Sequence, residues 1–246
     1  MKVISVSGIT KTGKTTTIEN IIKELVRRGY SVGTVKEIHN EAFAIDSEGK
    51  NTYRHRQAGA GTVTALGYYE TDVLYKGKMD IYDVLKHYTE DFVILEGVEN
   101  ANVPNIATAK QVEDLKDNDL TFLISGVIAN SVKDEIKSLQ VLSAIDDIKE
   151  IVDKILEVTP DLMPKMDIDC CGSCGMSCRE LLKAIIKGKA KVTDCVIRTK
   201  NKVKLSINGK DVYIVPFVDK ILYNEIMGVV KELKGFFKGS TIEIKL

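Results

Sequence analysis

Apolar residues in the first 160 positions occur either in short continuous runs or at helical spacing. Residues 2–7 and 91–97 are short apolar runs of the kind that form fully buried strands. Residues 14–27 carry apolar side chains at the spacing of one helix face and end just before Gly29. We predict further strands at 31–36, 105–109 and 120–128, and further helices at 53–60, 81–88 and 144–158. Strands that alternate with helices in this way predict an α/β fold with a mostly parallel sheet.

Two segments of this region depart from the alternation. Residues 38–51 lack clear periodicity and predict a long loop beside the ligand-binding edge of the sheet. Residues 62–66 and 69–75, which Gly67 separates, predict a hairpin that could form an antiparallel edge of the sheet. The helix at 144–158 is expected to bury its helix-spaced apolar side chains, namely Ile145, Ile148, Ile151, Val152, Ile155 and Leu156.

A domain boundary is predicted after the last of these helices, because Pro160 and Pro164 break the helical pattern. We expect residues 1–160 to form the α/β domain, 161–199 a cysteine module, and 200–246 a tail packed with that module. In the tail, alternating residues on both sides of Asn208-Gly209 predict a hairpin. A helix carrying Leu222, Ile226, Val230, Leu233 and Phe237 should follow, and a last strand could lie at 241–246.

Composition and charge narrow the class of protein. The 246 residues include 35 basic and 35 acidic side chains, so no overall field attracts nucleic acid or an anionic membrane. No apolar run approaches the roughly 20 residues that span a bilayer. The N-terminal apolar stretch is too short for a signal peptide and leads straight into a glycine-containing loop. We therefore expect a cytoplasmic protein that binds neither nucleic acid nor membrane.

The first strand and helix flank a phosphate-binding motif, G-x-x-x-x-G-K-T. Its glycines let backbone N–H groups point at phosphate oxygens, and the helix N-terminus adds the positive end of its dipole. Lys14 can reach the β- and γ-phosphates, and the Thr15 hydroxyl suits Mg²⁺. The predicted nucleotide contacts of the loop are Gly8, Ile9, Thr10, Lys11, Thr12, Gly13, Lys14, Thr15 and Thr16.

Other candidate site residues follow strands of the predicted sheet. Glu96 ends an apolar strand, and in phosphate-loop proteins such a carboxylate faces Mg²⁺ or its water. We assign Lys14 and Glu96 the catalytic roles and predict that Lys36 contacts phosphate. Asp46, on the long loop, could help to hold Mg²⁺. Arg54 and His55 could line the phosphate site, although a basic helix face is usually solvated.

All five cysteines lie between positions 170 and 195, which indicates a metal centre rather than a disulfide framework. Cys171, Cys174 and Cys178 are closely spaced, and Cys195 supplies a fourth thiolate. Four thiolates suit an iron–sulfur cluster or tetrahedral zinc, and three close ligands plus one remote favour the cluster. Free or redox-active thiols are the third alternative. Cys170 could replace Cys171 or simply be packed.

Residues 1 to about 158 resemble the molybdopterin-guanine dinucleotide biosynthesis protein B family (MobB). The resemblance rests on the loop Gly8–Thr15, residues 28–36, residues 46–60 and the strand end Leu95-Glu96-Gly97. It implies a P-loop NTPase fold, GTP with Mg²⁺, often a homodimer, and weak GTPase activity. It also implies an accessory role in attaching GMP to molybdopterin for molybdenum or tungsten cofactors, with molybdopterin and the guanylyltransferase as partners. The prediction of GTP rather than ATP rests on this resemblance alone, because the sequence has no Asn-Lys-x-Asp element for guanine.

The cysteine region is similar to the small [4Fe–4S] domains of several electron-transfer and corrinoid-linked proteins. The similarity covers Cys171-Gly172-Ser173-Cys174-Gly175, Cys178-Arg179, residues 184–188 and Cys195. It implies a small C-terminal α+β iron–sulfur domain with Cys171, Cys174, Cys178 and Cys195 as ligands.

Three hypotheses compete. The leading one is a GTP-binding accessory protein of molybdenum or tungsten cofactor biosynthesis with a fused [4Fe–4S] centre. The second is a nucleotide-gated redox or metal-cluster carrier that does not act on molybdopterin. The third is a binding module whose cysteine site holds structural zinc. Iron content and colour separate the third from the others, since a zinc protein is colourless.

Overall fold

The computed structural model describes residues 1–98, 101–163, 175–195, 203, 205–207, 210–212, 214, 216–237 and 242. The chain divides into two compact units, Met1–Lys165 and Met166–Leu246, which are described separately below. The predicted boundary after residue 160 and the finer division into residues 161–199 and 200–246 stay predictions.

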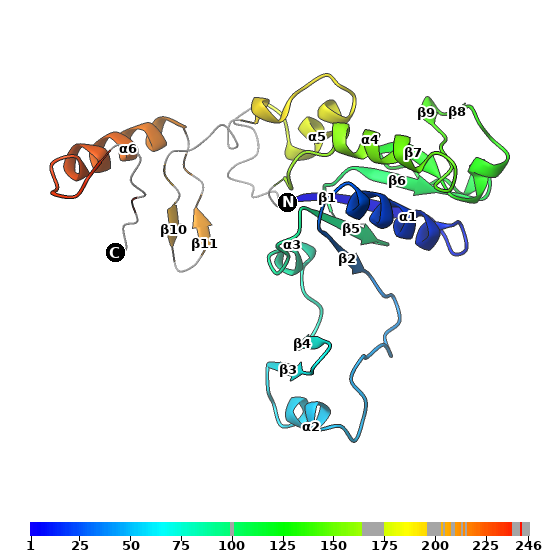
Figure 1. Cartoon of the computed structure of the whole chain (residues 1–246), viewed down its shortest axis with the longest axis horizontal. Coiled ribbons are helices and arrows are strands. Elements are labelled where there is room, and N and C mark those ends of the chain that lie inside the picture. The colour runs from blue at the N-terminus through cyan, green and yellow to red at the C-terminus, as the bar shows by residue number, and fades with distance from the viewer. Residues whose placement is uncertain are drawn as a thin grey trace. The chain divides into compact units, whose positions relative to one another are not determined.

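The first unit is built on a five-stranded parallel sheet (Figure 1). The strands are β1 (Lys2–Ser7), β2 (Val32–Lys36), β5 (Phe92–Glu96), β6 (Asn105–Thr108) and β7 (Thr121–Ser125). They lie in the order β2-β5-β1-β6-β7, so β5 is beside β1. The structure therefore confirms the α/β fold with its parallel sheet.

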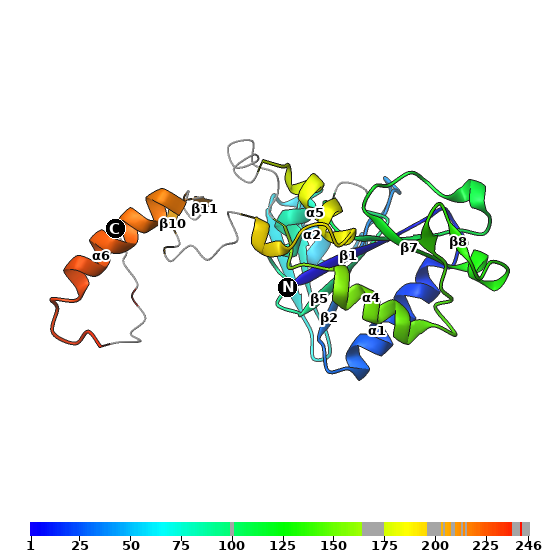
Figure 2. The same cartoon turned by 90° about the horizontal axis from the view of Figure 1, so that it is seen from above.

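One face of the sheet is covered by α1 (Lys14–Arg27) and α4 (Ile148–Val158), which lie side by side (Figure 2). Alternate residues of each strand point to this face, because side chains in a strand have a period of two. In β1, for example, Ile4 and Val6 belong to the cluster under the helices, while Val3 belongs to a cluster on the opposite face.

The opposite face is covered by short elements rather than long helices. These are α3 (Ile81–Leu85), the 3₁₀ turns η1 (Val112–Asp114) and η2 (Val127–Asn130), and the paired strands β8 (Glu135–Ile136) and β9 (Leu139–Gln140). Apolar side chains from β6 and β7 pack there with Leu115 and Leu139. Connecting segments rather than long helices therefore shield this face of the sheet from solvent.

Several predicted elements of this unit have bounds that differ from the prediction. The predicted helix at 144–158 begins only at Ile148, because the Ser143 hydroxyl accepts hydrogen bonds from the N–H groups of Ile145 and Asp146 and holds a turn there. Ile145, which was expected in the core, is 69% exposed. The predicted strand at 120–128 ends at Ser125, where Gly126 takes a φ of +89° and η2 follows. The predicted helix at 81–88 ends at Leu85.

Residues 37–80 form an arm that leaves the sheet after β2 (Figure 1). It contains the predicted loop, then α2 (Asn51–Gln57), which starts and ends a few residues before the predicted bounds, and the hairpin β3 (Thr62–Leu66) and β4 (Thr71–Tyr75). The hairpin is confirmed, but its prediction as an edge of the central sheet is wrong, because β3 and β4 form a separate two-stranded sheet. Leu66 is 83% exposed and Val63 is the buried residue of β3, so the hairpin has little apolar surface to place against the main sheet.

The second unit contains α5 (Cys178–Ile186), the 3₁₀ turn η3 (Val192–Asp194), the strands β10 (Leu205–Ile207) and β11 (Lys210–Val212), and α6 (Pro216–Val230). The antiparallel pairing of β10 with β11 confirms the predicted hairpin, although Asn208 and Gly209 lie outside the described residues. The predicted last helix ends at Val230, so Leu233 and Phe237 are not part of it and are 59% and 69% exposed. The predicted strand at 241–246 falls almost wholly outside the described residues. Across the described part of the chain, no helix has both the length and the apolar character needed to cross a membrane.

Candidate nucleotide site

The loop between β1 and α1 has the backbone that its glycines predict. At Gly8 the φ is +151°, and a Cβ there would lie 2.3 Å from the carbonyl oxygen of Thr108. Any side chain at this position would therefore collide with the backbone of β6. The loop can pass so close to β6 only because residue 8 is glycine.

A buried hydroxyl pair supports the loop from below. Thr12 is fully buried, and its Oγ1 lies 2.8 Å from the Oγ1 of Thr108 and 2.9 Å from the Ile9 carbonyl oxygen. The Thr108 hydroxyl also lies 3.0 Å from the carbonyl oxygen of Ser7. Thr108 ends β6, so these contacts join the end of the neighbouring strand to both the start and the middle of the loop.

The segment after β7 supports the same loop. The Val127 N–H donates to the Thr12 carbonyl oxygen over 3.0 Å. A Cβ at Gly126 would lie 2.2 Å from that oxygen, so glycine is needed for this close approach. Neither Thr108 nor Gly126 was predicted from the sequence to belong to the site. The available signals were a polar residue at the end of an apolar strand for Thr108 and a glycine that interrupts an apolar strand for Gly126.

A cleft of about 830 Å³ lies above the loop at the carboxyl ends of the strands. This volume falls within the range of small-molecule sites in proteins. Its lining residues are Ser7, Gly8, Ile9, Thr10, Lys11, Gly13, Lys14, Thr15, Thr16, Lys36, Glu37, His39, Glu96, Gly97, Lys116 and Val127. Four lysines against two glutamates make the cleft suited to an anionic ligand.

The structure brings most of the predicted site residues together at this cleft. Of the predicted loop contacts, eight line it and Thr12 lies buried beneath them. Lys36 and Glu96 line it as well. Glu37, His39, Lys116 and Val127 were not identified as site residues from the sequence, whereas Gly97 belongs to the strand end on which the family resemblance rests. Glu37 and His39 lie within three residues of the end of the predicted strand at 31–36 and so could have been placed at the same edge.

The ammonium group of Lys14 folds back onto the loop. Its Nζ donates to the carbonyl oxygens of Gly8 at 2.8 Å and Ile9 at 2.6 Å. Partial burial lowers the pKa of Lys14 from its usual 10.5, while the nearby Glu96 carboxylate opposes this shift. The charge of Lys14 is thus held over the loop at the point where phosphate oxygens could take over the role of the two carbonyls.

Glu96 and Lys36 form an ion pair at the end of two neighbouring strands. They are direct register partners in the parallel pairing of β2 with β5, and Lys36 Nζ lies 3.2 Å from Glu96 Oε1. The Glu96 side chain is 16% exposed and the Lys36 side chain 60%. The carboxylate predicted to face Mg²⁺ therefore lies beside the loop but is paired with the exposed ammonium group of Lys36.

Asp46 and α2 interact with each other on the arm. Asp46 Oδ1 accepts hydrogen bonds from the Thr52 hydroxyl at 2.9 Å and the Ser47 N–H at 3.1 Å, and Arg56 lies 3.7 Å from Oδ2. The described residues that line the cleft do not include Asp46, Arg54 or His55. Their predicted contacts with Mg²⁺ and the nucleotide stay predictions.

Two of the predicted cluster ligands lie in the described part of the second unit. Cys178 is the first residue of α5 and Cys195 follows η3, and their exposed fractions are 7% and 2%. A capping box between Ser177 and Glu180 fixes the start of α5, and hence the position of Cys178. Cys170, Cys171 and Cys174 lie outside the described residues, and among the described ones no group of three metal-ligating side chains occurs.

Comparisons with known proteins match both parts of the chain. Residues 3–129 match the family model described as "Molybdopterin guanine dinucleotide synthesis protein B", MobB. Residues 169–197, which include all five cysteines, match the family model "Putative Fe-S cluster". The second match agrees with the predicted similarity of this region to iron–sulfur domains.

Two relatives, of which the first matches over the full length of this chain, agree with the first match. The chain is 34% identical over 255 residues to a "Putative molybdopterin-guanine dinucleotide biosynthesis adapter protein" of Methanocaldococcus jannaschii, covering 100% of this chain and 97% of that protein. It is 27% identical to a "Probable molybdopterin-guanine dinucleotide biosynthesis adapter protein" of Bacillus subtilis, covering 46% of this chain and 68% of the relative.

A solved structure supports the fold. The crystal structure of Bacillus subtilis MobB superposes with a TM-score of 0.52 at 24% identity, covering 67% of this chain and 100% of the other. At that identity the superposition speaks for the fold alone. The family model over residues 3–129 and the full-length relative go further, and together they show that this chain belongs to the molybdopterin guanine dinucleotide synthesis protein B (MobB) family.

Proposed function

We propose that this chain binds GTP with Mg²⁺ in the cleft above the phosphate loop and hydrolyses it slowly. We further propose that it serves as an accessory protein in making molybdopterin guanine dinucleotide cofactors of molybdenum or tungsten. The observation that carries the proposal is the lysine-lined cleft over a supported phosphate loop, in a chain whose relatives are named as adapters of this pathway.

The chain's own residues fit a triphosphate. Loop N–H groups and the N-terminus of α1 offer donors to phosphate oxygens. Lys14 is close enough to exchange its two carbonyl partners for the β- and γ-phosphates, and Lys36 adds a second cation. Thr15 and Glu96 would hold Mg²⁺, which when bound neutralises charge on those phosphates.

We expect hydrolysis to be slow because of the side chains that line the cleft near Glu96 and Lys36. Of the described lining residues there, Glu96, Glu37 and His39 are the side chains that could accept a proton from water. Glu96 is paired with Lys36, and Glu37 forms an ion pair with Lys78. Both carboxylates are thus engaged by lysines rather than free to orient an attacking water, so we expect weak GTPase activity rather than rapid turnover.

Partners of the proposed function are molybdopterin and the guanylyltransferase of the same pathway, and the chain is proposed to act as a homodimer in the cytoplasm. These features rest on the family. The adapter names of the relatives support a role beside another enzyme rather than one as a stand-alone catalyst.

For the second unit we propose a [4Fe–4S] cluster held by Cys171, Cys174, Cys178 and Cys195. The two described thiols fit this role, because both are buried and iron–sulfur centres are tuned by solvent exclusion. Zinc is the alternative that four thiolates also suit.

Nucleotide binding can be tested by titrating GTP with and without Mg²⁺ into the full-length chain. We expect micromolar affinity that Lys14→Ala weakens strongly. Lys23→Ala is the matched control, because Lys23 is exposed on the same helix and does not line the cleft. Absence of guanine nucleotide binding at micromolar concentration would refute the proposal.

The pathway role needs a second assay, in which the chain is added to the guanylyltransferase reaction and dinucleotide product is measured. We expect more product with wild type than with Lys14→Ala. If GTP instead alters the potential of the metal centre and leaves product formation unchanged, the protein is a nucleotide-gated carrier.

The metal centre can be identified on protein purified without oxygen. We expect a broad absorbance near roughly 400 nm and about four irons per chain. Both should be lost in Cys195→Ser. Stoichiometric zinc without colour would refute the cluster.

A further inference from the structure

The strand order divides the cleft into two ends. Glu96 and Lys36 lie on β5 and β2, on one side of β1, whereas β6 and β7 lie on the other side. Mg²⁺ in phosphate-loop proteins bridges the β- and γ-phosphates, so the γ-phosphate belongs at the carboxylate end. The nucleoside must then extend toward β6 and β7.

Two residues that line the cleft lie at its β6 and β7 end. Lys116 comes from the connection between β6 and β7, and Val127 follows β7. The Val127 backbone is fixed to the loop through Thr12, and its side chain is 42% exposed. An exposed apolar side chain at this place offers a surface on which the flat face of a base can rest.

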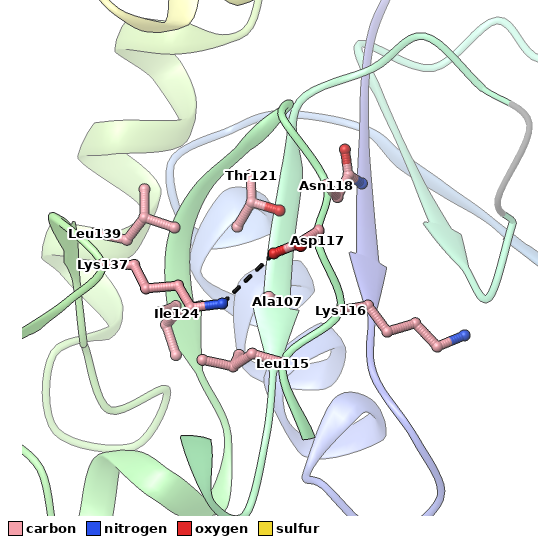
Figure 3. Close-up of a pocket in the computed structure, with 9 residues that line it drawn as sticks. All are labelled: Ala107, Leu115, Lys116, Asp117, Asn118, Thr121, Ile124, Lys137 and Leu139. Atoms are coloured by element: carbon pink, nitrogen blue, oxygen red, sulfur yellow. Dashed lines mark hydrogen bonds and ion pairs between the residues drawn. The ribbon is translucent and has the colours of Figure 1, made fainter. Parts of the chain in front are cut away.

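The residues on either side of Lys116 are held by contacts of their own. Leu115, one residue before it, packs with the apolar cluster on the face of the sheet opposite α1 and α4. Asp117, one residue after it, points into a neighbouring small cavity and lies 3.4 Å from Lys137 (Figure 3). Lys116 lines that cavity too, and in the same view the end of its side chain extends away from the other lining side chains. Lys116 also lines the nucleotide cleft, so its side chain lies at the border between the small cavity and the cleft.

The connection that carries Lys116 is held at both ends. A capping box between Gln111 and Asp114 closes η1 before it. After it, Asn118 accepts a hydrogen bond from the Leu120 N–H at 3.0 Å and ends the turn into β7. A lysine between two such fixed turns can select a ligand atom rather than only add charge.

We infer that Lys116 is a specificity-determining residue for the base and donates a hydrogen bond to the 6-oxo group of guanine. Guanine presents acceptors at O6 and N7, whereas adenine presents an amino donor at position 6, which an ammonium group cannot contact favourably. The inference rests on the proposed nucleotide function. It supplies a physical reason for GTP over ATP in a chain that lacks an Asn-Lys-x-Asp element.

The test compares the affinities of GTP, ITP and ATP for the full-length chain and its Lys116→Met variant. ITP keeps the 6-oxo group and lacks the 2-amino group, so it should bind like GTP in wild type and better than ATP. In Lys116→Met, GTP and ITP should weaken about tenfold, the low end for a hydrogen bond to a charged group, while ATP changes little.

Two control variants isolate the effect. Lys11→Met removes a lysine on the phosphate loop and should weaken all three nucleotides alike, leaving the GTP-to-ATP ratio unchanged. Lys110→Met removes an exposed lysine on the same connection that does not line the cleft, and should change nothing.

The outcomes separate this inference from the proposed function. If wild type binds none of the nucleotides, the proposed function fails. If it binds them and Lys116→Met leaves the GTP-to-ATP ratio at the wild-type value, or if wild type prefers ATP, the assignment of Lys116 is overturned and nucleotide binding stands.

Discussion

Gly126 is the residue whose replacement most directly tests how the phosphate loop is supported. Its backbone has a φ of +89°, and a Cβ would lie 2.2 Å from the Thr12 carbonyl oxygen and 3.0 Å from the Thr108 Cβ. Gly126→Ala therefore introduces both backbone strain and a collision with the phosphate loop.

The two contributions have different sizes. Gly126 combines its φ of +89° with a ψ of −155°, a backbone region essentially restricted to glycine, and another residue there costs roughly 1–3 kcal/mol. Relieving the collision requires the Thr12 carbonyl to move by about 1 Å, and forced shifts of this kind in a packed interior cost roughly 1–3 kcal/mol. We expect the free energy of unfolding to fall by about 2–6 kcal/mol in total.

Gly29→Ala is the matched control. Gly29 has the same φ of +89°, but a Cβ there would meet nothing within 4 Å. The free energy of unfolding of the Gly29→Ala variant should fall only by the cost of backbone strain, about 1–2 kcal/mol, and the variant should keep wild-type nucleotide affinity.

The assay is urea unfolding of the three proteins together with a titration of fluorescent GTP. Because the Gly126→Ala substitution displaces the loop that holds phosphate, we expect at least a tenfold loss of affinity, since a misplacement of about 1 Å is costly at a preorganised site. If Gly126→Ala matches Gly29→Ala in stability and wild type in affinity, the proposed support of the loop by the segment after β7 is refuted.

Three further predictions follow from individual contacts. Thr108→Val removes a buried hydroxyl and should lower the free energy of unfolding by about 1–3 kcal/mol in urea unfolding, whereas Thr108→Ser should stay near wild type. Hydrogen bonds from Arg27 and Arg28 lower the pKa of Glu24 from 4.5 to about 2, so its carboxylate stabilises the fold above pH 4.5 and stops doing so as the pH falls toward 2. The stability deficit of Glu24→Gln should accordingly shrink over that interval, and a deficit independent of pH would contradict the assignment. Ser177→Ala removes the cap of α5 and should cost about 1 kcal/mol and reduce the iron retained by the chain, while Ser177→Asp should preserve both.

Much of the first unit could be predicted from the sequence, because its signals are local. The strands and α1 are set by the period of apolar residues, and the phosphate loop is set by glycines and a lysine at fixed spacing. Most errors lie at element ends, where a single residue decides, and the placement of the β3–β4 hairpin at the edge of the central sheet was also wrong. The Ser143 hydroxyl delays α4, and the positive φ of Gly126 ends β7.

The sequence by itself determined the fold class, the phosphate loop and the lysine and glutamate that end two neighbouring strands. Only the tertiary structure decided that Thr108, Gly126, Val127 and Lys116 serve the same site. These residues lie about a hundred positions from the loop and carry no motif. They meet it because parallel strands bring their carboxyl ends to one edge of the sheet, and the order of those strands cannot be derived from local periodicity.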